Sequence, residues 1–153
     1  KKNFSLDGCS APQYSFKIKY ISRALNNLIK SYKNNYEYTD QVRTLVNSIL
    51  KNPEFIGGTV SFDTKVINAS KGKIFCKSGA EGVFLFVDFQ KEISGVIKIT
   101  DGNERAIPIA ILNIFKKFKV MSKVELKNLE KKEKFELKNH AGRNIGCISL
   151  TMK

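Results

Sequence analysis

Several residue types are scarce in this chain of 153 residues, which has no tryptophan, three prolines and a single histidine. The low proline and glycine content excludes collagen-like, mucin-like and low-complexity classes. With 42% hydrophobic residues, the chain is long enough to fold as one domain and too short for two ordinary ones. The longest apolar run, 107–115, is interrupted by Pro108 and Asn113 and is far shorter than the roughly 18 residues of a membrane span. We therefore expect a globular domain with no membrane partner.

The three cysteines, Cys9, Cys76 and Cys147, form no C-x-x-C pair. An odd number of isolated cysteines argues against a disulfide framework and against a self-contained zinc ribbon. Free thiols are typical of the reducing cytoplasm, which is where we expect this protein. The sequence begins with lysine and not with methionine, so we expect it to be part of a longer polypeptide or a processed product.

Positive charge is in large excess, because 27 Lys and Arg residues face 14 Asp and Glu residues for a net charge of +13. Such a charge makes nucleic acid or an anionic surface the first candidate partner. Only four of these cations are arginines, however, and the lysines are scattered along the chain. Proteins that read nucleic acids more often cluster arginine on one element. We therefore expect no nucleic-acid partner, and a non-catalytic basic binding module stays the alternative function.

Apolar residues spaced three and four apart predict an amphipathic helix over residues 20–32. A second helix is predicted to open at Thr39 or Asp40, since both residue types can cap free amides, and to end at the Asn-Pro pair 52–53. Asp63 is predicted to cap a short third helix in the same way. These helices have polar backs and one apolar face each, so we expect them to cover a sheet or one another.

The middle of the chain predicts three strands, 73–77, 83–89 and 96–100, which are rich in β-branched and aromatic residues. The last two are close enough for an antiparallel hairpin. The second is apolar on both alternating faces, so we expect both faces to be covered. The segment 105–118 is apolar almost all round, which predicts a helix buried against that sheet, with Pro108 in its first turn.

The C-terminal part of the chain begins with a segment rich in charge, 119–134, which we interpret as a linker. A terminal pair of strands is predicted around 135–137 and 145–148. The overall prediction is an α+β fold in which an antiparallel sheet packs against helices. We expect residues 1–153 to form a single, partial domain.

Residues 77–82 (KSGAEG) place a lysine, a hydroxyl and a glycine at the end of a predicted strand. A lysine and a hydroxyl beside bare backbone amides can bind a carboxylate and relay a proton, provided that burial lowers the pKa of the lysine. The glycine lets a substrate approach the backbone closely. The alternative for this hexapeptide alone is a β-turn with a solvated lysine.

Residues 7–12 (DGCSAP) place an acid and a thiol two positions apart in a second loop. Such a loop can present the Asp7 carboxylate to an ammonium group of a substrate and the Cys9 thiolate to a metal ion. One cysteine does not make a metal site. The alternative for Cys9 is an ordinary, partly buried thiol.

Taken in chain order, these motifs resemble the thermolabile, Rhizobium-type L-asparaginase II family. The resemblance runs from about residue 6 to residue 148 and includes 52–58 (NPEFIGG), 62–64 (FDT), 97–102 (IKITDG) and 139–142 (NHAG). It implies a fold similar to that of serine β-lactamases and penicillin-binding proteins. Within such a fold this chain corresponds to the C-terminal part.

The resemblance implies hydrolysis of the side-chain amide of L-asparagine to aspartate and ammonia, through a serine nucleophile and a covalent acyl-enzyme. Lys77 matches the catalytic lysine that helps to activate the nucleophile. The substrate-binding candidates are Asp7, Ser78, Gly79 and Glu81. A β-lactamase or peptidase activity is disfavoured, because the surrounding motifs match the asparaginase pattern.

The resemblance also implies a zinc ion next to the pocket, with Cys9 as one ligand beside another cysteine and a lysine. Those two ligands and the nucleophilic serine, in an S-x-x-K motif, belong to the N-terminal half of the family, which we expect this chain to lack. We therefore expect the chain to be inactive alone and to need that half or a homo-oligomer partner. Zinc is expected only in the complete enzyme, and a decayed remnant of the scaffold is the further alternative.

Overall fold

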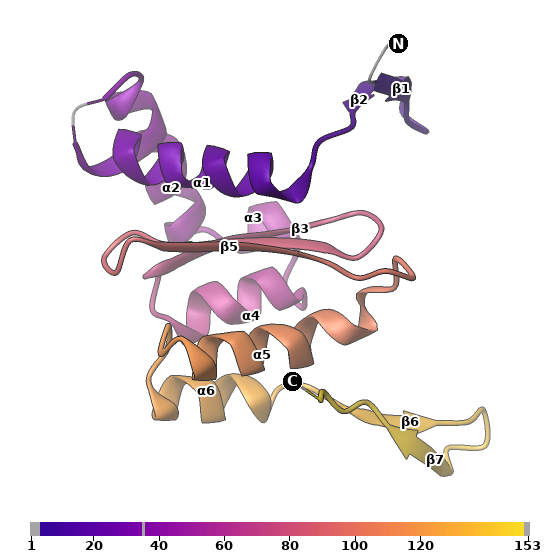
Figure 1. Cartoon of the computed structure of the whole chain (residues 1–153). Coiled ribbons are helices and arrows are strands. Elements are labelled where there is room, and N and C mark those ends of the chain that lie inside the picture. Colours follow the sequence, from indigo (N-terminus) through magenta and orange to yellow (C-terminus); the bar gives the residue numbers. More distant parts are fainter. Residues whose placement is uncertain (1–3, 35, 152–153) are drawn as a thin grey trace.

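A computed structural model of the chain describes residues 4–34 and 36–151. A three-stranded antiparallel sheet lies between two layers of helices, and a small two-stranded hairpin stands near each end of the chain (Figure 1). The elements in chain order are β1 (Phe4–Leu6), β2 (Pro12–Tyr14), α1 (Ile18–Lys33), α2 (Thr39–Lys51), α3 (Glu54–Gly57), α4 (Phe62–Ala69), β3 (Ile74–Gly79), β4 (Val83–Asp88), β5 (Ile93–Lys98), η1 (Glu104–Ala106), α5 (Ile107–Lys117), α6 (Lys123–Glu130), β6 (Glu136–Lys138) and β7 (Asn144–Cys147). The predicted α+β class is confirmed.

The central sheet has the order β3-β4-β5, so β4 is its middle strand and β3 one of its edges. β4 is apolar on both faces, and each face belongs to a different core. Phe84 and Phe86 join the cluster formed with α4 and α5, whereas Val87 joins the cluster formed with α1 and α2. The predictions of a strand covered on both faces and of an antiparallel hairpin are confirmed, although the third strand starts at Ile93, earlier than expected.

Helices α1 and α2 form the layer on one face of the sheet, as their apolar periodicity predicts. Leu25 of α1 and Val46 of α2 are buried there. The prediction that Thr39 or Asp40 caps α2 is wrong. The cap position is Tyr38, in a left-handed conformation with φ of 59°, and no side chain caps the free amides.

Helix α5 covers the other face, with Pro108 in its first turn as predicted. Phe115 meets Phe86 edge to face, with ring centroids 4.9 Å apart. Gly95 of β5 lies opposite Phe86, and a Cβ at this position would come within 2.5 Å of the ring. A glycine is therefore required here by the close approach of an aromatic side chain.

The segment 119–134, predicted to be a charged linker, contains helix α6. Ser122 opens this helix through a capping box, in which its hydroxyl accepts from the amide of Glu125 at 3.2 Å and the Glu125 carboxylate accepts from the amide of Ser122 at 2.8 Å. Leu129 anchors the helix in the main core. The linker prediction is therefore wrong. The helix was not predicted because it has only eight residues, many of them charged, and its apolar stripe is too short to recognise in the sequence.

Of the two hairpins, one was predicted from the sequence and the other was not. The terminal pair, β6 and β7, confirms the predicted pair of strands. The pair formed by β1 and β2 was not predicted, and it is exposed along its whole length. No helix within residues 4–34 and 36–151 has the length and the apolar character needed to cross a bilayer.

Candidate active site

The edge strand β3 carries Lys77 and Ser78 to the rim of the sheet. Alternation along the strand buries Cys76 completely in the main core and gives its neighbour Lys77 the opposite face. Ser78 returns to the face of Cys76, on which helix α4 packs. The site therefore forms where the end of β3 meets the first turn of α4.

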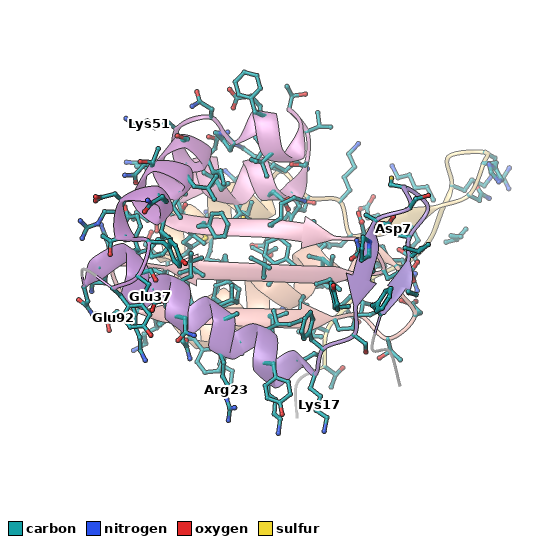
Figure 2. All side chains as sticks on the ribbon, turned by 90° about the horizontal axis from the view of Figure 1, so that it is seen from above. Asp7, Lys17, Arg23, Glu37, Lys51 and Glu92 are labelled. Atoms are coloured by element: carbon teal, nitrogen blue, oxygen red, sulfur yellow. The ribbon has the colours of Figure 1, made fainter. Side chains whose placement is uncertain are left out.

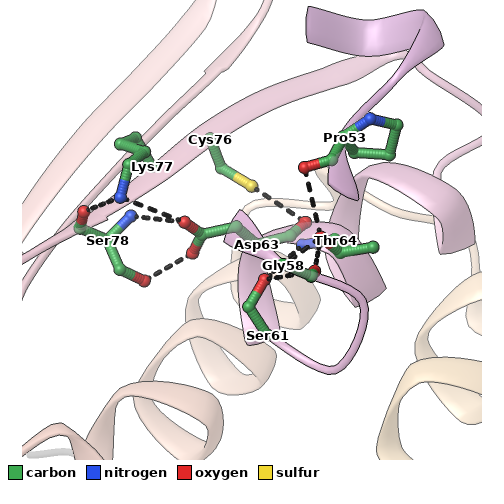
Figure 3. A network of polar contacts seen from close by, with 8 residues as sticks. All are labelled: Pro53, Gly58, Ser61, Asp63, Thr64, Cys76, Lys77 and Ser78. Atoms are coloured by element: carbon green, nitrogen blue, oxygen red, sulfur yellow. Dashed lines mark hydrogen bonds and ion pairs between the residues drawn. The ribbon is translucent and has the colours of Figure 1, made fainter. Parts of the chain in front are cut away.

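Asp63, in the first turn of α4, organises this site (Figure 3). Its side chain is almost fully buried, yet one carboxylate oxygen accepts from the backbone amide of Ser78 at 2.9 Å and the other accepts from the Ser78 hydroxyl. The ammonium of Lys77 lies 3.5 Å from the same carboxylate and also donates to the Ser78 carbonyl. Three donors thus compensate the buried charge, as a buried carboxylate requires.

The prediction that Asp63 caps α4 is wrong, because Ser61 is the cap. Its hydroxyl oxygen accepts from the amide of Thr64 at 3.1 Å. The Thr64 hydroxyl is close to two carbonyl oxygens, 2.6 Å from that of Gly58 and 3.3 Å from that of Pro53. This network fixes the loop before α4 and leaves the carboxylate of Asp63 free to face β3 (Figure 3).

A cleft of about 420 Å³ opens beside this cluster. Lys77 and Ser78 line it together with Asp63, and Glu104 and Arg105 of η1 line it from another element. The Arg105 guanidinium is held by Asp101, at 2.6 Å, outside the cleft lining. Among the described residues, Glu104 has no ion-pair or hydrogen-bond partner for its carboxylate. The cleft has the size of a small-molecule site and carries charges of both signs.

Lys77 differs from its predicted state. A proton relay through this lysine was expected to require its burial, but its side chain is 44% exposed. The structure instead gives the ammonium a carboxylate partner in Asp63. Position and charge pairing, not desolvation, are therefore what the fold provides for Lys77.

Gly79 and Glu81 lie beyond the cluster. Gly79 ends β3, and a Cβ added there would make ordinary contact with Val83 at 3.4 Å. Glu81 is exposed in the turn that follows, and its backbone carbonyl accepts from the ammonium of Lys98. Neither Gly79 nor Glu81 is among the described residues that line the cleft.

Asp7 and Cys9 lie in the loop of the β1–β2 hairpin, which stands apart from the helix layers (Figure 1; Asp7 is labelled in Figure 2). One Asp7 oxygen accepts from the amides of Ala11 at 2.9 Å and Cys9 at 2.8 Å, and the other accepts from the Gln13 side chain at 2.9 Å. The amide of Ala11, and then that of Cys9, lowers the pKa of the Asp7 carboxyl below its ordinary value. Asp7 thus organises its own loop.

The fit of the chain to zinc can be judged from its donors. Cys9 is an exposed, free thiol, and the oxygens of nearby Asp7 are engaged with backbone and amide groups. Within residues 4–34 and 36–151, no three His, Cys, Asp or Glu residues are placed to share a metal ion. A zinc ion usually needs four ligands. The described residues therefore offer zinc one candidate ligand, Cys9, and do not form a site by themselves.

The expectation that this chain lacks the S-x-x-K spacing is wrong, because the spacing occurs at 48–51 and at 70–73. Ser48 is exposed on α2 and Ser70 is buried after α4. Both hydroxyls donate to a backbone carbonyl of the preceding turn, at 2.7 Å and 2.9 Å. Neither serine belongs to the described lining of the cleft beside Lys77, so neither takes the place of the family nucleophile.

Comparison with known families identifies the chain. A family model described as L-asparaginase II matches residues 1–150. The chain belongs to the L-asparaginase II family. The match spans both the Asp7–Cys9 hairpin and the strand with Lys77, so the resemblance derived from the motifs is confirmed. No curated protein matches the chain. The likeness to β-lactamases stays a prediction.

Proposed function

We propose that this chain forms the Lys77-bearing part of an L-asparaginase active site, which hydrolyses the side-chain amide of L-asparagine to aspartate and ammonia. The observation that carries the proposal is the cluster of Lys77, Ser78 and Asp63 at a cleft, in a chain whose family match covers nearly its whole length. A lysine held by a buried carboxylate next to a hydroxyl is a fixed proton-handling group at the edge of a small pocket.

In the proposed reaction, a serine outside this cluster attacks the side-chain carbonyl carbon of asparagine. Its hydroxyl proton is passed with the help of Lys77 to the leaving nitrogen as the C–N bond breaks, so that the nitrogen leaves as ammonia and the acyl group stays on the serine as an ester. Water then hydrolyses the ester and releases aspartate. Asp63 is a positioning residue in this scheme, because it holds Lys77 and Ser78 in place and acts on the reaction through them.

The cleft suits the zwitterionic end of the substrate. Arg105 is fixed by Asp101 on one side and retains further N–H donors, which favours it as the partner of the α-carboxylate. Glu104 lines the same cleft and is the natural partner of the α-ammonium group. Ser78 is proposed to contact the substrate through its hydroxyl oxygen. These roles add Arg105 and Glu104 to the substrate-binding candidates.

The nucleophile and the other zinc ligands are proposed to come from a polypeptide segment that this sequence does not contain, supplied as a partner chain or as part of a longer protein. Asp7 and Cys9 would complete the site from the hairpin side, with zinc tuning substrate binding. The three free cysteines support a cytoplasmic location. A relation of the fold to serine β-lactamases belongs to the same proposal.

The test is release of ammonia from L-asparagine by the chain alone and by the chain mixed with a polypeptide that supplies the family's S-x-x-K half. We expect activity in the mixture only, and its loss in Lys77→Ala. Lys98→Ala is the matched control, because Lys98 is a lysine at the end of the β5 strand and outside the cleft lining.

Two outcomes contradict the proposal. Equal activity of the Lys77→Ala variant and the native chain in the mixture would remove Lys77 from the mechanism. No activity in the mixture, once the two chains are shown to fold and associate, would leave a decayed remnant or a binding module on the same scaffold.

A further inference from the structure

A second cavity, of about 960 Å³, lies at the opposite end of the sheet from Lys77. It is lined by the start of β3, the end of β4, the end of α5 and most of α6. Ile74 belongs to this cavity and Ser78 to the cleft of the candidate active site. The two residues are four positions apart along β3, which is roughly 13 Å at the rise of a β-strand. The cavity is therefore a separate site with its own chemistry.

The wall of this cavity combines an apolar floor with a basic rim. Ile74, Val120 and Met121 are buried residues on the apolar side. The basic side consists of six lysines: Lys73, Lys91, Lys116, Lys119, Lys123 and Lys127. A ligand that fills such a cavity needs an apolar body and a negatively charged end.

Two of the six lysines have partners within the protein. Lys73 pairs with Glu125 at 3.1 Å, and Lys91 donates to the carbonyls of Lys119 and Val120 in the loop between α5 and α6. The ammonium groups of the other four have no partner among the described residues. These four cations are therefore available to a ligand.

The acids of the same wall do not neutralise those four cations. The Glu125 carboxylate pairs with the Lys73 ammonium and accepts from the backbone amide of Ser122 in the cap of α6. Asp88 is buried, and one of its oxygens accepts from the amides of Gln90 and Lys91. Glu130 is the remaining acid of the described lining. Like charges around a concave, low-dielectric wall focus the field and attract anions.

We propose that this cavity binds a phosphorylated small molecule with an aromatic or apolar body, of the nucleoside diphosphate class. A volume near the upper end of the range for ligand pockets accommodates a base and a sugar on the apolar floor. The unpaired lysines at the rim then face the phosphates as compact point charges. The wall combines an apolar floor with a short arc of cations, which favours a small molecule over a nucleic-acid strand, because a strand needs a charged groove that follows its backbone.

The test uses isothermal titration of the chain with ADP at physiological salt. The double variant Lys119→Glu and Lys123→Glu reverses two exposed rim charges without touching the core. The matched control is Lys17→Glu and Lys51→Glu, which makes the same change in net charge at exposed lysines of the α1 and α2 layer (Figure 2). Thermal melting of both variants establishes that they fold.

We expect the rim variant to weaken ADP binding about tenfold or more, because two attractive charges at the cavity become repulsive. The control variant is expected to change ADP binding by about threefold at most, because its charges are distant from the cavity and are screened by salt. Pyrophosphate and adenosine, each with half of the proposed chemistry, are expected to bind more weakly than ADP. Equal weakening in both variants would show diffuse attraction to a basic protein and would overturn the proposal. Pyrophosphate binding as tightly as ADP, or no ADP binding at this salt, would also overturn it.

Discussion

Two of the motifs that carry the family resemblance lie in very different surroundings. Lys77 and Ser78 are part of a sheet that is covered on both faces, and a buried carboxylate fixes them. Asp7 and Cys9 lie on an exposed hairpin that is held by hydrogen bonds within its own loop. The comparison teaches that the core of this chain fixes the surroundings of Lys77, whereas Asp7 is organised only by its own loop.

The largest contrast is expected from one aromatic residue in each region. Phe84 of β4 is fully buried, so Phe84→Ala is expected to lower the free energy of unfolding by about 4 kcal/mol. Tyr14 of the hairpin is 62% exposed, so Tyr14→Ala is expected to change it by about 0.5 kcal/mol at most. Urea denaturation measures both. Similar losses in the two variants would mean that the hairpin is part of the cooperative core.

A smaller effect is expected from Asp63→Ala. The change removes the acceptor of the Ser78 amide and hydroxyl and the partner of Lys77, so we expect a loss of about 2–3 kcal/mol. Asp101→Ala, at an exposed carboxylate, is the control in the same urea titration. If the two variants were equally stable, the buried carboxylate would not be what fixes the Lys77 side.

The cap of α6 sets a pH dependence. The Ser122 amide holds the Glu125 carboxylate and lowers its pKa from 4.5 to about 2. A lowered pKa in the folded state gives stability that is present above pH 4.5 and lost as the pH falls toward 2. We expect Glu125→Gln to lower the free energy of unfolding at neutral pH by about 1 kcal/mol, which is the usual contribution of a helix cap.

Thermal melting between pH 7 and pH 2 measures this effect. The variant is expected to lose less stability on acidification than the native chain. Parallel curves for the two proteins would contradict the assignment of Glu125, while Glu130→Gln, on the same helix but outside the capping box, controls for the loss of one charge.

The smallest effect is expected in the hairpin. Asp7→Asn removes the charged acceptor of the Cys9 and Ala11 amides, so hydrogen exchange at these two amides should accelerate while the melting temperature stays unchanged. Because the pKa of Asp7 is lowered, the native loop keeps its amide protection above pH 3.8 and loses it as the pH falls through the lowered value. A drop in the melting temperature would show that the loop supports the core.

Much of the fold followed from periodicity, because the helices and strands of the core bury large, regularly spaced apolar residues. β4 and α5 are the clearest cases, with apolar runs too long for an exposed element. α6 and the β1–β2 hairpin were missed for the opposite reason. They are short and largely exposed, and capping and side-chain hydrogen bonds hold their ends, which no periodicity reveals.

The candidate site was predictable in part. Lys77 and Ser78 were found from the residue types at the end of a strand, and the cleft beside them supports that choice. Asp63 was predicted to cap the helix, because an aspartate near the start of a helix can either cap the free amides or direct its carboxylate at a neighbouring strand. The sequence does not distinguish these two cases. Only the packing of α4 on β3 distinguishes these two roles. Arg105 and Glu104 line the same cleft from η1, which is distant in sequence from β3 and α4, so no local pattern predicts their place there.

The bond from the Ser78 amide to Asp63 has a further consequence for how the molecule behaves in concentrated solution. β3 is an edge strand, and an outward amide on such a strand is a template for pairing with another chain. The Asp63 carboxylate occupies the acceptor position that the carbonyl of an added strand would take. The same side chain that fixes Lys77 thus also blocks strand addition at the Ser78 end of this edge.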